Sequence, residues 1–376
     1  MRNQSLSLLA LGALAAVCSC DRAGVTARPF GTLSTGEEVT VFELRNHSGA
    51  TVTVMDYGAR LVGAEMPDRN GKFGDVIASF ADLEDFEHTD RFMGPIIGRY
   101  GNRIDHSSFV LDGVRYDVVP NEDFDGQPVQ CHGGLMGFDR FVWEAETLQE
   151  KDRVGVRFHR LSPDGEQGFP GNLDCSCTFW LTDANVLKLE YEAETDKPTV
   201  VNLSNHAYFN LKGDEGGYVM DHLFTVEADT CVLNNLHFCP DRLLPVDGTP
   251  FDFREPHRVD YRLDMPDRHL TIMRGMSACW KVRGYDGTLR KAADLYERRS
   301  GRGVETWTTE PALLTYTGRN FNGTQKGKYG PIEKYGAMLL ETIHFADSPN
   351  QDRFPSTVLR PGEKYYTTTE YRFYAR

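Results

Sequence analysis

The sequence predicts an all-β protein, one large antiparallel β-sandwich spanning about residues 29–376, on three observations. Apolar and polar residues alternate with a period of two rather than about 3.6, which is typical of half-buried strands. Turn-forming clusters rich in Gly, Pro, Asn and Asp separate the alternating runs. No shift in composition marks a domain boundary within the 376 residues, and no internal repeat indicates a propeller.

The composition is that of a globular protein with an acidic balance. The chain is 40% hydrophobic and 26% charged, and its 41 basic and 55 acidic residues give a formal net charge of −14. This length is ample for a large core. Because nucleic-acid backbones are themselves anionic, the charge argues against a nucleic acid as partner.

The first 20 residues have the layout of a secretory signal. An apolar run from Leu6 to Val17 is too short to span a bilayer and is followed by small residues. The ending VCSC resembles a bacterial lipoprotein signal, in which Cys20 would become the lipidated N-terminus; a plain cleaved signal peptide is the alternative. We therefore expect a signal over residues 1–20, a tether over 21–28, and export to the periplasm or anchoring in a membrane through Cys20.

Three successive runs show the strand pattern most clearly. Their apolar positions are Val154, Val156 and Phe158; then Leu173, Cys175, Cys177, Phe179 and Leu181; then Leu187, Leu189, Tyr191 and Ala193. The stretch FVLDGVRYDV (109–118) places Asp-Gly between two alternating runs, which predicts a tight hairpin. Residues 81–92 have room for one or two helical turns.

Six cysteines follow the signal, and none has zinc spacing, so no metal site is expected. They are Cys131, Cys175, Cys177, Cys231, Cys239 and Cys279. Export would permit disulfides, but the sequence does not determine a pairing. Cys175 and Cys177 would share one face of a strand, and we interpret them as small core residues.

Four stretches place unusual polar residues beside glycine, proline or aromatic residues. They are GRYGNRIDHSSF (98–109), VQCHGGLMGFDRFVW (129–143), VNLSNHAYFNL (201–211) and GAMLLETIHF (336–345). Each has a structural interpretation. Arg103 could pair with a carboxylate, His132 could cap a glycine turn, and His206 could be a hydrogen-bonded core histidine. Glu341 follows an apolar run, and burying an unpaired carboxylate there would be costly.

Five ordered motifs resemble the aldose 1-epimerase, or galactose mutarotase, family. GRYGNRI, CHGG, SPDGEQGFPG, NHAYFNL and LLET occur in the family's order and approximate spacing, and the resemblance extends to LRPGEKYYTTTEYRF at 359–373. It implies a galactose mutarotase-like supersandwich with a cleft on one sheet, a free aldose as small-molecule partner, and neither a metal nor an organic cofactor. We expect a monomer or a weak dimer.

The resemblance implies two catalytic residues. The family's catalytic base matches Glu341 and its catalytic acid matches His206. The base would remove the proton of the C1 hydroxyl while the acid protonates the ring oxygen O5, and the open-chain aldehyde would rotate about C1–C2 and reclose. A carboxyl with a pKa of about 4.3 and an imidazole with one of about 6.5 suit these roles near neutral pH if the site raises both values.

The resemblance also implies sugar-binding residues. His132 would hydrogen-bond the sugar near its ring oxygen, and Asn102 and Arg103 would hold its hydroxyls. Tyr208 or Phe209 would offer an apolar wall.

The sequence departs from the family pattern at two sugar-contacting positions. RGMSACW (274–280) places Ser277 where the family has an aspartate. Leu314 stands two residues before the Tyr-Thr-Gly run at 316–318, where the family has a glutamine. Exchanging a charged acceptor for a hydroxyl changes hydroxyl-specific binding by about 1–3 kcal/mol. We therefore expect a preferred sugar that is not simply galactose or glucose.

Three alternatives remain open. The first is a related epimerase or isomerase acting on another sugar. The second is a non-catalytic carbohydrate-binding protein, which would need no acid/base pair. The third is a glycoside hydrolase or lyase, but hydrolases usually need two carboxylates across the scissile bond and only Glu341 is a candidate.

Overall fold

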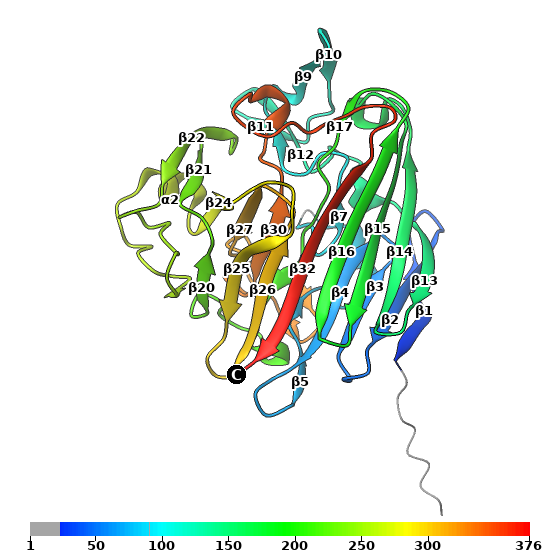
Figure 1. The fold of residues 1–376 in the computed structure, drawn as a ribbon, viewed down its shortest axis with the longest axis vertical. Coiled ribbons are helices and arrows are strands. Elements are labelled where there is room, and N and C mark those ends of the chain that lie inside the picture. Colours follow the sequence, from blue (N-terminus) through cyan, green and yellow to red (C-terminus); the bar gives the residue numbers. More distant parts are fainter. Residues whose placement is uncertain (1–22, 90) are drawn as a thin grey trace, which may run out of the picture.

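The computed structural model describes residues 23–89 and 91–376, and its strands form layers of antiparallel sheet around a shared core (Figure 1). The predicted all-β antiparallel sandwich is confirmed. The predicted signal at 1–20, including Cys20, lies outside the described residues.

The nine-stranded sheet forms one layer. Its spatial order is β13 (Glu144–Gln149), β14 (Arg153–Ser162), β15 (Leu173–Thr182), β16 (Val186–Thr195), β32 (Tyr365–Ala375), β26 (Arg302–Thr308), β25 (Arg290–Tyr296), β20 (Leu223–Val226) and β23 (His257–Arg258). The apolar positions predicted for the three alternating runs lie on β14, β15 and β16 and are all buried. Their register aligns Val156 with Phe179 and Phe179 with Leu189, so one face of the sheet is continuously apolar.

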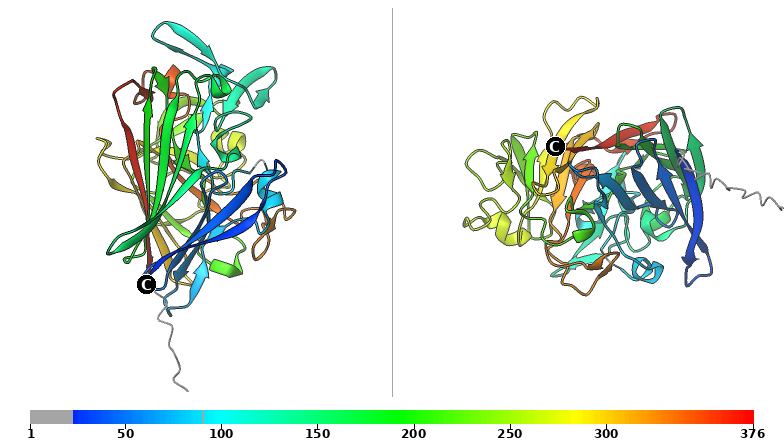
Figure 2. Two further views of the ribbon diagram at one scale, coloured as in Figure 1. Left: turned by 90° about the vertical axis from the view of Figure 1, so that its right-hand side faces the viewer. Right: turned by 90° about the horizontal axis from the view of Figure 1, so that it is seen from below.

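A five-stranded sheet near the N-terminus covers part of that apolar face. Its order is β1 (Gly24–Thr32), β2 (Glu38–Arg45), β3 (Thr51–Met55), β4 (Arg60–Pro67) and β5 (Phe73–Asp75). Figure 2 (left) shows these blue strands and the green β13–β16 as two layers. Phe42 of β2 meets Phe158 of β14 edge to face, with ring centroids 5.9 Å apart, a favoured aromatic geometry.

The predicted tether at 21–28 is wrong where the structure describes it. Strand β1 begins at Gly24, and residues 24–28 pair with residues 41–45 of β2. Backbone hydrogen bonds to β2 satisfy the N–H and C=O groups of this segment. Such pairing does not require alternating apolar residues, so the sequence did not indicate a strand here.

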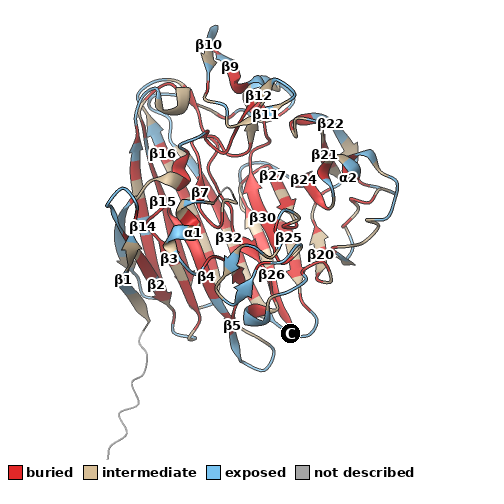
Figure 3. Cartoon of the chain, turned by 180° about the vertical axis from the view of Figure 1, so that it is seen from behind, coloured by how far each residue is buried: buried red, intermediate tan, exposed pale blue. Residues whose placement is uncertain are grey.

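The seven-stranded sheet lies beside the five-stranded one and faces the other half of the nine-stranded sheet. Its order is β22 (Pro240–Pro245), β21 (Thr230–Asn234), β24 (Ser277–Lys281), β27 (Ala312–Tyr316), β30 (Met338–Ile343), β19 (Tyr208–Phe209) and β6 (Ile77–Ala78). Met338 and Leu340 of β30 point into the core shared with β32, where Tyr371 donates a hydrogen bond to the Leu340 carbonyl (2.8 Å). Figure 3 shows buried residues along the strands of both sheets.

The remaining strands are short and lie outside the three large sheets. The strands are β7 (Ile96–Ile97), β8 (Arg103–Ile104), β9 (Ser108–Leu111), β10 (Val114–Asp117), β11 (Glu122–Phe124), β12 (Gln127–Cys131), β17 (Thr199–Val200), β18 (Ser204–Asn205), β28 (Lys326–Gly327), β29 (Gly330–Pro331) and β31 (Val358–Leu359). The predicted hairpin is confirmed as β9–β10, with Asp112 and Gly113 at positive φ (51° and 79°) in its turn.

Helices are few and short in the described ranges. They are α1 (Leu83–Glu87), α2 (Arg268–Met273) and the 3₁₀ turns Asp105–Ser107, Phe138–Arg140, Glu166–Gly168, Gly213–Glu215 and Ser348–Asn350. Helix α1 confirms the helical turn predicted within 81–92. None of the described helices has the length and apolar character needed to cross a lipid bilayer.

The six cysteines after the signal are all buried and carry free thiols. Cys175 and Cys177 lie in the main core, as predicted. Burial raises the pKa of the Cys175 thiol to about 12, so this group stays protonated and inert.

Candidate active site

A cavity of about 610 Å³ opens over the outer face of the seven-stranded sheet. Its floor includes one cross-strand row, in which Tyr208 of β19 lies opposite Leu339 of β30, Leu339 opposite Tyr316 of β27, and Tyr316 opposite Ser277 of β24. Residues directly opposite in antiparallel strands point to the same face. Strand register therefore brings four segments distant in sequence onto one surface.

The next row brings together the histidine and the glutamate. Glu341 is two residues beyond Leu339 on β30, so it shares that face. The β19–β30 pairing ends at Tyr208 and Leu339, and His206 and Glu341 each lie two residues beyond this last pair. The Ser204 hydroxyl donates to the Thr342 carbonyl (2.9 Å) and holds the segment before His206 against β30.

Glu341 is fully buried, at 0% exposure, between Leu314 on β27 and the His206 segment. Neither of its carboxyl oxygens has a hydrogen-bond partner among the described residues. Because burial disfavours the charged form, it raises the pKa of Glu341 to about 8. A buried polar group without a partner is costly and needs an explanation, and a bound ligand is one.

His206 is held by its backbone while its ring keeps an unsatisfied atom. Its N–H donates to the Pro95 carbonyl and its carbonyl accepts from the Gly94 N–H, both at 3.0 Å. The ring is 6% exposed, and its Nδ1 has no partner in the described part of the chain. Burial lowers the pKa of His206 to about 4, so the imidazole is neutral at pH 7.

The expectation that the site raises both pKa values is wrong for His206. Burial disfavours charge on either group, so it raises an acid's pKa and lowers that of a base. Between about pH 4 and pH 8 the pair therefore holds one proton, initially on the Glu341 carboxyl. A protonated carboxyl can donate and a neutral imidazole can accept a proton, so the two side chains can supply acid and base to a polar ligand.

His132 lies beside His206, with ring centroids 5.2 Å apart. Its Nδ1 accepts the backbone N–H of Asn102 (3.2 Å) and its own backbone N–H donates to the Asn102 carbonyl (3.0 Å). Nε2 therefore carries the ring proton and is the free donor. The turn needs glycine next, because Gly133 has φ of 91° and a Cβ there would lie 1.9 Å from the Gly98 carbonyl oxygen.

Arg103 forms a two-pronged ion pair with Glu122. Its Nε and Nη2 donate to the two carboxylate oxygens at 2.6 and 2.8 Å, and its guanidinium lies over the Phe238 ring at 5.3 Å. The structural interpretation of Arg103 therefore holds, and the residue also lines the cavity together with Asn102.

The structure brings all six sequence-predicted site residues to this cavity, five of them as lining residues and Glu341 in its buried floor. Ser277 and Leu314 line it as well. Lining residues that sequence reasoning missed include Arg91, Phe92, Phe124, Asn234, Phe238, Met273 and Arg319. Arg319 alone had a signal, because it directly follows the Tyr-Thr-Gly run at 316–318.

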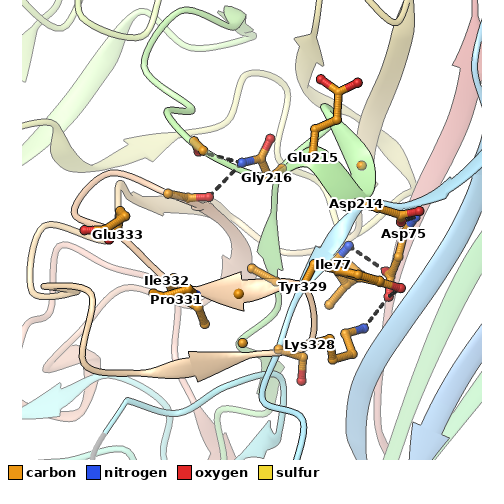
Figure 4. A pocket seen from close by; sticks show the side chains of 18 residues that line it. Asp75, Ile77, Asp214, Glu215, Gly216, Lys328, Tyr329, Pro331, Ile332 and Glu333 are labelled. Carbon is orange, nitrogen blue, oxygen red and sulfur yellow. Dashed lines mark hydrogen bonds and ion pairs between the residues drawn. The ribbon is translucent and has the colours of Figure 1, made fainter.

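Other hollows in the described structure are poorer candidates. The pocket in Figure 4 lies between Ile77, the Gly213–Glu215 turn and the β28–β29 hairpin. It holds about 90 Å³, an ion pair between Lys328 and Asp75 lies along its edge, and small-molecule sites usually measure about 300–1,000 Å³. A further cavity of about 620 Å³ beside Tyr285 and Phe345 has the size but no histidine in its lining.

Comparison with known proteins gives a consistent match. The aldose 1-epimerase family model matches residues 40–372. Galactose mutarotase of Homo sapiens is 38% identical over 356 residues, covering 93% of this chain and 99% of that protein. Aldose 1-epimerase of Escherichia coli (strain K12) is 34% identical, covering 90% and 96% of the two chains.

Solved structures agree with this result. The crystal structure of a galactose 1-epimerase from Lactobacillus acidophilus NCFM superposes with a TM-score of 0.82 at 26% identity, covering 94% of this chain and 99% of that one. A GalM/aldose epimerase homologue from C. elegans gives 0.78 at 28% identity, covering 89% and 98%.

Proposed function

Because this chain belongs to the aldose 1-epimerase family, we propose that Glu341 and His206 are the proton-transfer pair with which it interconverts the α and β anomers of a free aldose. The chain is thus an isomerase. One observation carries the residue assignment: two buried ionisable groups, each with unsatisfied polar atoms and each two residues beyond the last β19–β30 pair, lie at the floor of a cavity of about 610 Å³.

The reaction needs one proton removed and one delivered. Glu341, as carboxylate, takes the proton of the C1 hydroxyl, while His206, as imidazolium, gives a proton to O5. The C1–O5 bond breaks and C1 becomes an aldehyde carbon. After rotation about C1–C2, the O5 hydroxyl attacks the other face of C1, and the two protons return along the reverse path.

Substrate binding sets the starting protonation state. In the empty site the single proton resides on Glu341, because burial penalises an ion pair there. A sugar hydroxyl that donates to Glu341 and a ring oxygen that accepts from His206 stabilise the charged form by hydrogen bonds. Transfer of the proton from Glu341 to His206 then produces the required base and acid without any proton from solvent.

The remaining lining residues orient the ring. The free Nε2–H of His132 is a donor for a sugar oxygen near the His206 side of the cavity. Arg103 is fixed by Glu122, so its guanidinium presents outward N–H groups at little cost in side-chain entropy. Tyr208 packs beside the His206 ring (5.1 Å between centroids) and supplies an apolar wall.

Mutarotation kinetics test the assignment. We expect the wild type to accelerate equilibration of a freshly dissolved pure anomer, followed by polarimetry, and Glu341→Gln to lose nearly all of that acceleration. The matched control is Glu305→Gln, which removes a carboxylate on β26 paired with Lys291 and far from the cavity. Tight sugar binding by the wild type without accelerated mutarotation would favour a carbohydrate-binding protein instead.

We further propose a substrate preference shifted away from galactose and glucose. The support is that Ser277 and Leu314, the two departures from the family pattern, both line the cavity. A hydroxyl and an aliphatic side chain offer a different set of hydrogen bonds from a carboxylate and an amide. Rates across a panel of aldoses test this, and ordinary efficiency with both galactose and glucose would refute it.

Export is a separate proposal supported by the sequence of residues 1–20 alone. We propose cleavage of this signal, either immediately before Cys20, which is then lipidated as the new N-terminus, or after it as a plain signal peptide. Mass spectrometry of the protein isolated from its native host tests both, because an intact Met1 would contradict export and an unmodified mature N-terminus would contradict lipidation.

A further inference from the structure

The cavity is rich in arginine although the chain is acidic. Four arginines and three carboxylates line it: Arg91, Arg103, Arg140 and Arg319 against Glu122, Asp123 and Asp139. The whole chain has a formal charge of −14. The balance of charge at the cavity therefore opposes that of the molecule.

Two of these arginines are fully engaged by the protein. Arg103 pairs with Glu122 through two hydrogen bonds. Arg140 lies 3.1 Å from the Asp139 carboxylate and donates to the carbonyls of Glu87 and Thr89 (2.8 and 2.7 Å). Both guanidinium groups are therefore bound by other protein groups in the cavity wall.

Arg319 differs from both. It forms no ion pair with any carboxylate in the described ranges, and its Nε is buried without a hydrogen-bond partner. Its guanidinium lies over the Tyr316 ring, 5.2 Å from the centroid. A stacked guanidinium keeps its N–H edge available for a planar anion.

The surroundings make a positive charge at this point unfavourable in the absence of a ligand. Burial lowers the pKa of Arg319, and the nearby guanidinium groups of Arg103 and Arg274 add to the effect. An anion placed against Arg319 would offset both the burial of its charge and the repulsion from the neighbouring guanidinium groups, and would accept a hydrogen bond from its unpartnered Nε. The opposite floor residue, Ser277, carries no charge that would repel such an anion.

Arg319 is connected to His206 through two aromatic rings of the cavity floor. Tyr316, over which it stacks, has its ring 6.2 Å from that of Tyr208, and Tyr208 has its ring 5.1 Å from that of His206. In a hexopyranose, C6 is attached to C5, the neighbour of O5, so a ring whose O5 is at His206 carries its C6 group beside His206, from where these rings lead to the guanidinium.

We propose that the preferred substrate is an acidic aldose, a hexuronic acid whose carboxylate pairs with Arg319 while His206 and Glu341 act at its C1–O5 end. A carboxylate suits the site because one guanidinium fork binds it through two parallel hydrogen bonds. The inference rests on the proposed function, of which it names the substrate class.

The test compares mutarotation of galacturonate and glucuronate with that of galactose and glucose, at low and at high ionic strength. We expect kcat/KM at least 10-fold higher for a hexuronate, with the advantage shrinking in salt. Arg319→Gln should lower hexuronate kcat/KM by about 10- to 100-fold, mainly through KM, and should lower kcat/KM of the neutral sugars far less. Arg115→Gln, an exposed arginine on β10, is the matched control.

Each other outcome overturns a defined part of the account. Faster turnover of neutral aldoses, with no effect of Arg319→Gln, refutes the inference and leaves the proposed function intact. A preference for hexose 6-phosphates over hexuronates retains an anion site but refutes the carboxylate assignment. If no sugar is turned over, the proposed function fails, and calorimetric titration with galacturonate and galactose still decides whether Arg319 binds an acidic sugar.

Discussion

The nine-stranded and seven-stranded sheets share one core but are built differently. Strands β14, β15 and β16 have ten residues each, with apolar side chains at most core-facing positions. In the seven-stranded sheet β19 and β6 have two residues each, and the buried residues include Glu341, Thr315 and Ser277.

The difference shows how the fold separates stability from chemistry. The outer face of the nine-stranded sheet carries many partly exposed polar residues, several of them in ion pairs such as that of Lys188 with Glu190. The outer face of the seven-stranded sheet is roofed by the segments that line the cavity, so ionisable groups on it are desolvated and acquire shifted pKa values. We therefore expect substitutions in the first sheet to change stability and substitutions in the second to change rate.

The largest expected effect is on rate. Glu341→Gln and His206→Asn should each lower kcat/KM by about 10²–10⁴-fold, because each removes one proton transfer. Neither should lower the free energy of unfolding in urea, since both groups are unsatisfied in the folded state. If a variant lost activity only because it unfolds, the expectation that substitutions in the seven-stranded sheet change rate and not stability would be wrong.

The next effect is on the pH dependence of stability. The folded protein keeps a proton on Glu341 up to about pH 8, whereas the unfolded chain releases it near 4.5. The folded state then binds more protons across this window, so stability falls as pH rises. Relative to Glu341→Gln, the wild type should lose roughly 4 kcal/mol of unfolding free energy between pH 5 and pH 9.

Urea unfolding of both proteins at several pH values measures this loss. His206 acts in the opposite direction between about pH 4 and its ordinary value of 6.5, but it is present in both proteins and largely cancels from their difference. A difference that stays constant with pH would mean that Glu341 has an ordinary pKa.

A core truncation in the nine-stranded sheet should show the complementary result. Leu189→Ala on β16 removes a buried side chain opposite Phe179 and should lower the free energy of unfolding by about 2–5 kcal/mol. The kcat of the folded fraction should be unchanged. Leu161→Ala on β14, where the side chain is 56% exposed, is the control and should stay within about 0.5 kcal/mol. A slower turnover in Leu189→Ala would show that the sheets are functionally coupled.

The smallest effect concerns sugar binding. His132→Ala removes one neutral donor worth about 0.5–1.5 kcal/mol, so KM should rise by about 2- to 10-fold with little change in kcat. If turnover at saturating sugar instead slowed by about two orders of magnitude, the scale of a lost proton transfer, His132 would belong among the groups that transfer protons.

The sequence was most informative where strands are long. Ten-residue strands show several periods of alternation, so β14–β16 and the β9–β10 hairpin could be predicted from pattern alone. Two-residue strands such as β18 and β19 show none, yet they position His206. Residues 24–28 were missed because backbone pairing, rather than apolar pattern, makes them a strand.

The candidate site could be predicted only residue by residue. Motif resemblance identified His206 and Glu341, but their juxtaposition depends on the β19–β30 register, which joins segments far apart in the chain. The direction of the His206 pKa shift depends on burial and could not be predicted. Arg319 was missed because its proposed role depends on the lack of a carboxylate partner among the described residues, which a sequence does not show.

A double-substitution cycle in mutarotation rate tests the central claim, that His206 and Glu341 act as one unit. Wild type, Glu341→Gln, His206→Asn and the double variant would be compared with one fresh anomer by NMR. The account predicts that the double variant is scarcely slower than either single variant, because removing one partner already disables the pair. Losses that multiply, so that the two substitutions act independently, would contradict it.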